Sequence, residues 1–249
     1  MRLPSVAVLG LAGLAFLAAC APPDSPETTA ETPAPAPVST VLTQAEQQAL
    51  TPDEVLVQLR EGNRRFVEDR LTPRDYKAQA AATADGQYPK AVILSCLDSR
   101  VPPEIVFDQG IGDLFVGRVA GNIEDVDMLG SLEFATKAAG SKAIVVLGHT
   151  QCGAIKGAVA GVEMGNLTAL LDNFDEVVAR ARAHIAEMQE AGVDTDAVVQ
   201  EAIEENVRQT IADILARSEI ISAMVANGEV AIAGGVYDLA TGEVTWLET

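Results

Sequence analysis

Short apolar runs alternate with longer amphipathic stretches over most of the chain. Five runs have the length and composition of β-strands: 91–95 (AVILS), 114–119 (LFVGRV), 143–148 (AIVVLG), 229–235 (EVAIAGG) and 243–247 (EVTWL). Helical periodicity fills the stretches 127–139, 167–190 and 196–226. Strands that alternate with helices predict an α/β fold, with a central, mostly parallel β-sheet flanked by helices.

A helix start marks the beginning of the folded part of the chain. Thr51 is a suitable cap and Pro52 suits the first turn, and Val55, Leu59 and Phe66 follow at helical spacing. We therefore expect one folded domain over residues 49–249, a length that can bury a sizeable core.

The start of the chain differs in composition from the rest. An apolar run over 3–19 follows Arg2 and is too short and too rich in Ala and Gly for a transmembrane helix. The string Leu17-Ala-Ala-Cys20 resembles the lipobox of bacterial lipoproteins. The resemblance implies that residues 1–19 are a signal peptide, cleaved before a lipidated Cys20. An ordinary signal peptide or an uncleaved anchor is the alternative.

A spacer is predicted after Cys20. Residues 20–48 are rich in Pro, Ala, Thr and Glu, a composition that favours an extended, flexible tether. We expect this tether and the lipid to hold the domain at the bacterial cell envelope, facing the periplasm. Ala21, which is not acidic, favours the outer membrane over the inner one.

Charge and cysteine content narrow the function. The chain carries 36 acidic and 17 basic residues, a net charge of -19, so nucleic acid is not an expected partner. It has three cysteines, too few for a disulfide framework. If Cys20 is lipidated, Cys96 and Cys152 are the thiols free to bind a metal.

Potential metal ligands follow two of the predicted strands. Cys96 comes directly after the strand 91–95, and His149 and Cys152 come after the strand 143–148. Ligand sites in open α/β sheets lie beyond the carboxyl ends of the strands, so one crevice can receive all three side chains. Two thiolates and one imidazole favour zinc, and three protein ligands with an open fourth position are typical of a catalytic site.

Asp98 and Arg100 lie close to the first of these ligands. A carboxylate there can occupy the fourth position on zinc, or a neighbouring guanidinium can hold it in a bidentate pair. In the second case the fourth position is open to water, and zinc makes hydroxide available near neutral pH.

The motif Cys96-x-Asp98-Ser-Arg100 with His149-x-x-Cys152 resembles the β-class carbonic anhydrases. The similarity runs from about residue 50 to the end of the chain. It includes the strings Gly62-Asn-Arg-Arg-Phe66, Pro102-Pro-Glu104, Gly112-Asp-Leu-Phe-Val116, Ala120-Gly-Asn122 and Gly148-His-Thr-Gln-Cys-Gly153. The resemblance implies a β-carbonic anhydrase fold and one zinc ion per chain. It also implies reversible hydration of carbon dioxide to bicarbonate and a proton by zinc-bound hydroxide, in a homodimer or larger homo-oligomer.

The resemblance also implies a type of substrate pocket. Gln87 and Phe115 match pocket residues of the plant-like members, and Gly153 follows the last zinc ligand. Ile93 stands where bicarbonate-regulated members carry tryptophan, which argues against their inhibitory bicarbonate pocket. Phe134 stands where plant-like members carry tyrosine, a departure that alters polarity at the pocket rim.

Two other functions agree with the same residues. A related zinc hydrolase acting on carbon disulfide or carbonyl sulfide would share the zinc ligands, so direct assay separates it. A non-catalytic zinc-binding lipoprotein is the third reading, and the presence of Gln87, Asp98 and Arg100 argues against it.

Overall fold

The computed structural model describes residues 35–188 and 192–248. The expected signal peptide, Cys20 and most of the tether lie outside these residues. The described elements belong to one compact unit, Ala36–Thr249. None of the helices among the described residues is long and apolar enough to cross a membrane.

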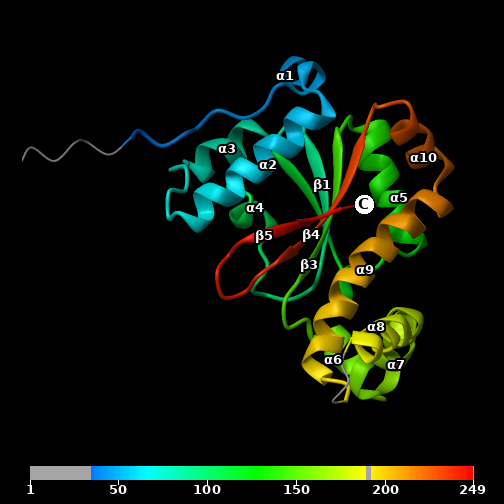
Figure 1. Cartoon of the computed structure of the whole chain (residues 1–249). Helices are drawn as coiled ribbons and strands as arrows, with labels where there is room; N and C mark the ends of the chain where they lie inside the picture. Colours follow the sequence, from blue (N-terminus) through cyan, green and yellow to red (C-terminus); the bar gives the residue numbers. More distant parts are fainter. Residues whose placement is uncertain (1–34, 189–191, 249) are drawn as a thin grey trace, which may run out of the picture. The chain divides into compact units, whose positions relative to one another are not determined.

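The described residues form one five-stranded sheet (Figure 1). Its strands are β1 (Ala91–Ser95), β2 (Leu114–Arg118), β3 (Ala143–His149), β4 (Ala231–Tyr237) and β5 (Val244–Leu247), in the order β2-β1-β3-β4-β5. The first four strands are parallel and β5 is antiparallel to β4. The predicted α/β class with a mostly parallel sheet is confirmed.

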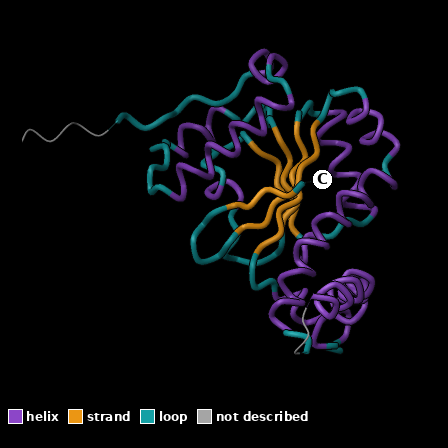
Figure 2. The backbone as a smooth tube through the Cα atoms, in the orientation of Figure 1, coloured by secondary structure: helices purple, strands orange, loops and turns teal. Residues whose placement is uncertain are grey.

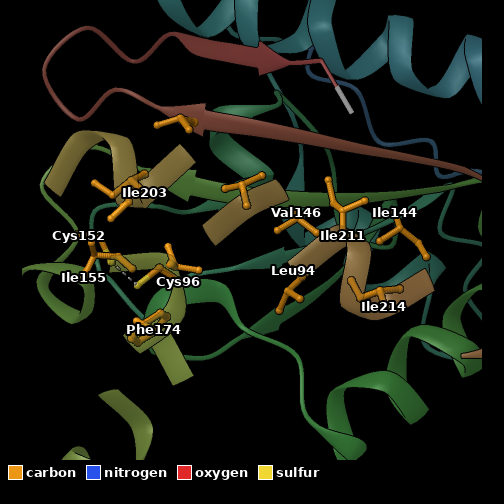
Figure 3. Packing of buried hydrophobic residues seen from close by; sticks show 14 of the residues in the cluster. Leu94, Cys96, Ile144, Val146, Cys152, Ile155, Phe174, Ile203, Ile211 and Ile214 are labelled. Atoms are coloured by element: carbon orange, nitrogen blue, oxygen red, sulfur yellow. Dashed lines mark hydrogen bonds between the residues drawn. The ribbon is translucent and has the colours of Figure 1, made fainter. Parts of the chain in front are cut away.

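Helices cover both faces of the sheet, as Figure 2 shows. The two faces carry separate apolar clusters because successive strand residues point to opposite sides. Leu94 and Val146 pack with Ile203 of helix α9 (Thr195–Arg217) in one cluster, shown in Figure 3. On the other face, strand residues such as Ile93 cluster with side chains of α2 (Pro52–Val67). The sheet is thus buried on both sides, as its continuous apolar strands require.

The first helices begin where their capping residues predict. Thr51 caps α2, and its side chain and that of Glu54 form a reciprocal capping box with Pro52 in the first turn. Thr43 and Glu46 form the same arrangement at α1 (Gln44–Ala49). The remaining helices before β3 are α3 (Tyr76–Ala82), α4 (Pro103–Val106), η1 (Ala120–Asn122), α5 (Val126–Glu133) and the π-helical η2 (Phe134–Ala138).

Two long helices expected from periodicity are interrupted. The stretch 167–190 contains α7 (Gly165–Leu171), the short η3 (Asp172–Phe174) and α8 (Asp175–Met188), after α6 (Gly153–Ala160). The stretch 196–226 is divided at Ser218 into α9 and α10 (Glu219–Ala226). Ser218 is extended, and its hydroxyl accepts from the Ile221 N–H and donates to Glu133. This local capping ends one helix and starts the next without breaking the apolar period.

Residues 36–48, which composition assigns to the tether, lie within the compact unit. Val38 forms a parallel bridge with Arg74, and the Gln79 side chain donates to the carbonyls of Val38 and Thr40. The buried Gln47 amide of α1 donates to the carbonyl of Pro89. Hydrogen bonds rather than apolar burial attach this segment, so its composition does not reveal the attachment.

Candidate metal centre

Cys96, His149 and Cys152 come together at one end of the sheet. Cys96 follows β1, His149 is the last residue of β3, and Cys152 is the residue that caps α6. Strands β1 and β3 are parallel neighbours with Ser95 opposite Leu147, so Cys96 and His149 follow at the same edge of the sheet. The potential ligand atoms lie within 4.8 Å of one another, and the two sulfurs are 3.9 Å apart. Figure 3 shows the two cysteine side chains next to each other. The predicted meeting of these three residues is confirmed.

His149 presents one ring nitrogen to this cluster. Its Nδ1 lies 2.9 Å from the Thr150 carbonyl oxygen, which can only accept, so Nδ1 carries the hydrogen. Its Nε2 is buried and has no hydrogen-bond partner among the described residues. A buried polar nitrogen is rarely left unpaired, so this atom is suited to bind a metal.

Thr150, which sequence reasoning did not select, provides the carbonyl that bonds to His149 Nδ1 and is itself held in place. Its N–H donates to the carbonyl of Tyr237, and its hydroxyl accepts the N–H of Leu239. These bonds tie the loop after β3 to the end of β4, and so fix the carbonyl that orients His149. In the sequence, only the position of Thr150 beside His149 points to this role. Its hydrogen-bond partners are 87 or more residues away in the chain, so the sequence does not reveal them.

The two sulfurs lie where backbone N–H groups stabilise negative charge. The Gly121 N–H points at the Cys96 sulfur with an N···S distance of 3.4 Å, and the hydrogen bond from Cys152 lowers the pKa of Cys96. The thiol of Cys152 has a raised pKa because the neighbouring Cys96 sulfur and burial both oppose its ionisation. The pair therefore retains a proton unless a cation neutralises the second thiolate.

Asp98 is held by Arg100 in a bidentate pair. Arg100 Nε donates to Asp98 Oδ1 at 2.9 Å and Nη2 donates to Oδ2 at 2.7 Å. The Arg100 backbone N–H also donates to Oδ1. The hydrogen bonds from Arg100 hold the pKa of Asp98 well below its usual range. The other side of the carboxylate faces the centre, with Oδ2 3.9 Å from His149 Nε2.

Arg118 supports the turn that carries both Cys96 and Asp98. From the last position of β2, its guanidinium donates from Nε to the Cys96 carbonyl at 3.0 Å and from Nη2 to the Asp98 carbonyl. Sequence reasoning assigned no role to this residue. Only the pairing of β2 with β1 brings its side chain to that turn.

Two of the three proposed pocket residues, Phe115 and Gln87, lie apart from the triad within one chain, whereas Gly153 is next to it. Phe115 is opposite Val92, four residues before Cys96, a separation of about 13 Å along a strand. Gln87 is exposed in the loop before β1, farther still from the centre. Gly153 is the first residue of α6 and follows Cys152 directly, with free space where a side chain would begin.

The donor set fits zinc. Two sulfurs and one imidazole nitrogen, all from residues at most 4% exposed, form a compact cluster of three ligands among the described residues. Zinc prefers these donors, and a set of three leaves its fourth position to solvent or substrate.

Comparison with known proteins agrees with this centre. A family model described as carbonic anhydrase matches residues 91–244. Carbonic anhydrase 2 of Mycobacterium tuberculosis is 41% identical over 185 residues, which are 74% of this chain and 87% of that protein.

Solved structures show the same fold. A β-carbonic anhydrase of Coccomyxa, in complex with acetazolamide, superposes with a TM-score of 0.61 at 28% identity, over 75% of this chain and 83% of that one. A tetrameric β-carbonic anhydrase of the ascomycete Sordaria macrospora gives 0.60 at 28% identity, over 70% and 90% of the two chains. The chain belongs to the carbonic anhydrase family, as a β-class zinc enzyme that hydrates carbon dioxide to bicarbonate.

Proposed function

We propose that hydration of carbon dioxide takes place beside Cys96, His149 and Cys152, with Asp98 and Arg100 as the residues that keep the site open. Cys96, His149 and Cys152 would hold the zinc ion, which would supply the Lewis acidity that makes hydroxide available near neutral pH. The single observation that carries the proposal is the buried, unpaired Nε2 of His149 beside two sulfurs.

Asp98 has two tasks in this proposal. Because Arg100 occupies both of its oxygens, the carboxylate is kept from becoming a fourth ligand of the metal. Because its pKa is low, it remains an acceptor through the neutral range, on the side that faces His149. It can thus orient a proton-bearing group near the centre without taking up the proton.

Metal analysis and a rate assay on one sample test the proposal. We expect one zinc per chain and rapid carbon dioxide hydration in stopped flow. The Cys96→Ser, Cys152→Ser double variant should lose both, and zinc that survives in it would rule out the ligand assignment. Parallel assays with carbonyl sulfide and carbon disulfide separate the related hydrolases, and zinc without any of these activities would support a non-catalytic role.

We propose further that the working enzyme is a homodimer or larger homo-oligomer. A groove of about 700 Å³ lies beside β2, the strand at one edge of the sheet, and Phe115 and Met128 line it. Val126 and Phe134 at this groove are 75% and 60% exposed. Exposed apolar surface beside an unpaired strand edge is typical of a protein interface. In the oligomer, Gln87 and Phe115 of one subunit are proposed to reach the zinc site of another.

The cellular location is proposed from the start of the chain alone. Cleavage before Cys20 and lipidation would anchor the enzyme in the cell envelope, on the periplasmic side, because two or more acyl groups give stable membrane attachment. Fractionation with detergent extraction and mass spectrometry of the N-terminus tests this location. Cys20→Ser should accumulate as an uncleaved precursor without acyl mass. Cytoplasmic wild-type protein with residues 1–19 intact would contradict the proposal and leave the zinc chemistry unaffected.

A further inference from the structure

A buried asparagine of helix α9 is linked to a zinc ligand through the backbone of one residue, Gly121. Asn206 is 3% exposed, and its side-chain Nδ2 donates to the Gly121 carbonyl at 2.7 Å. The N–H of the same residue, Gly121, points at the Cys96 sulfur at 3.4 Å. Two hydrogen bonds thus connect α9 to the ligand, although Asn206 and Gly121 are 85 residues apart in the chain.

Gly121 has the conformation that this arrangement requires. Its φ is +75°, in the left-handed region that favours glycine. A Cβ added to it would lie 2.3 Å from the ring of Phe174, so no larger residue fits without displacement. The Gly121 backbone is therefore confined on one side by Phe174, and the amide of Asn206 holds its carbonyl.

Burying the Asn206 amide at this position would destabilise the fold unless the side chain had a hydrogen-bond partner. Its helix neighbours Ile203 and Val207 belong to the apolar cluster against the sheet, where an unpaired amide would be destabilising. A leucine would suit the same position in an apolar interface. The hydrogen bond to the Gly121 carbonyl gives the Asn206 amide a partner, and it also holds that carbonyl in place.

We propose that Asn206 is a positioning residue of the metal centre, which holds Gly121 so that its N–H bonds to the Cys96 sulfur. An N–H donor draws electron density from a metal-bound sulfur. Groups that hydrogen-bond to metal ligands in this way change the properties of the bound metal. Asn206 does not touch substrate or metal. Its effect passes through the Gly121 backbone, from the carbonyl across the Cα to the N–H, and so reaches one of the two sulfurs.

Cobalt substitution of the full-length enzyme tests the role, because cobalt reports on its sulfur ligands. We expect Asn206→Leu to shift the sulfur-to-cobalt charge-transfer band to longer wavelength and to lower the turnover of the zinc enzyme about tenfold, the scale of such supporting contacts. Asn206→Ala, which also lacks the donor, should shift the band in the same direction. Thr210→Val is the matched control, since Thr210 lies one turn further along α9 and is 2% exposed. It should lower stability without moving the band.

A measurement on the wild-type protein keeps the inference open to refutation if the variants do not fold. With an NMR-active cadmium isotope in the site, the Gly121 amide proton should show scalar coupling to the metal through the sulfur. No coupling from Gly121 in the wild-type protein would overturn the proposal. So would folded Asn206 variants with the wild-type band and turnover, or a Thr210→Val variant that shifts the band equally.

Discussion

At the scale of single residues, the chemistry depends on where one carboxylate is held. Asp98 lies close enough to His149 Nε2, at 3.9 Å, to compete for a metal bound there. Arg100 opposes this with two side-chain hydrogen bonds of 2.7–2.9 Å. Whether the fourth position on the metal is open therefore depends on whether the Asp98 carboxylate stays with Arg100 or binds the metal.

Removing the guanidinium should close the site. We expect Arg100→Ala to free Asp98 to bind zinc and to reduce the hydration rate tenfold or more, the scale seen when a supporting group of a metal site is lost. Stopped-flow assays measure the rate. Arg70→Ala is a control, because Arg70 pairs with Glu68 on the exposed surface. In the wild-type enzyme near neutral pH, an Asp98 oxygen at a bonding distance of about 2.0–2.2 Å from zinc would contradict this account.

A second prediction at this scale concerns Ile93. Its side chain is fully buried and packs in the apolar cluster with Val145 and Leu147. By the family resemblance, this is the position at which the bicarbonate-regulated members carry tryptophan. We therefore expect no cooperative inhibition by bicarbonate. Activity is measured against added bicarbonate at fixed pH and ionic strength, and a sigmoidal loss would show the inference wrong.

At the scale of elements, one buried carboxylate ties several segments together. Asp108 follows α4 and its side chain is fully buried. It accepts hydrogen bonds from Arg65 of α2, and from Thr72 and Arg74 in the segment between α2 and α3. The ionised group thus ties the segment that precedes β1, from α2 to the start of α3, to the end of α4, which follows β1.

Neutralising this group should destabilise the protein. Removing one partner of a buried ion pair typically costs about 3–5 kcal/mol, so Asp108→Asn should lower the free energy of unfolding by about 3 kcal/mol. Denaturant unfolding measures the difference. Arg70→Ala, which breaks an exposed pair, should cost less than about 1 kcal/mol. Equal losses in the two variants would mean that Asp108 is not the organising group.

The same group predicts a dependence on pH. Burial raises the pKa of Asp108, but hydrogen bonds from Arg74, Thr72 and Arg65 outweigh burial and lower it below its ordinary 3.8. A group whose pKa is lowered by folding stabilises the folded state at pH values above its ordinary pKa. This stabilisation is lost as the pH falls through the pKa of the group in the folded protein. The stability gap between wild type and Asp108→Asn should therefore stay constant down to about pH 4 and narrow below it.

At the scale of the whole molecule, the question is which chain completes each site. Within one chain, Gln87 lies before β1 and the triad lies beyond its other end. The groove beside β2, with Val126 and Phe134 exposed, offers the surface for a second chain. A symmetric dimer would bury this surface in both copies.

Mixing two defective subunits tests this arrangement. Gln87→Ala keeps its zinc ligands, whereas His149→Ala keeps its glutamine. If Gln87 serves the partner's site, the mixed dimer has one complete site and should recover close to half of the wild-type activity. If it acts within its own chain, the mixed dimer should be no more active than the Gln87→Ala homodimer. The composition of the dimers is checked by mass spectrometry under native conditions.

Local chemistry explains why much of this was predictable. The strands are continuous apolar runs, and Thr51 with Pro52 carries its own start signal, so these elements could be recognised one at a time. The breaks in the predicted helices were not recognisable in this way. Ser218 separates α9 from α10: its hydroxyl accepts from the Ile221 N–H and donates to Glu133, and the second partner is distant in the chain.

The sequence by itself determined the fold class and the three metal ligands, because strand periodicity and the placement of Cys96, His149 and Cys152 after strands are local properties. Only the tertiary structure decided what surrounds those ligands. Arg118 reaches the turn after β1 from β2, and Asn206 reaches Gly121 from α9. Their physical role is to satisfy or orient particular backbone groups, and the identity of those groups depends on packing between segments far apart in the chain.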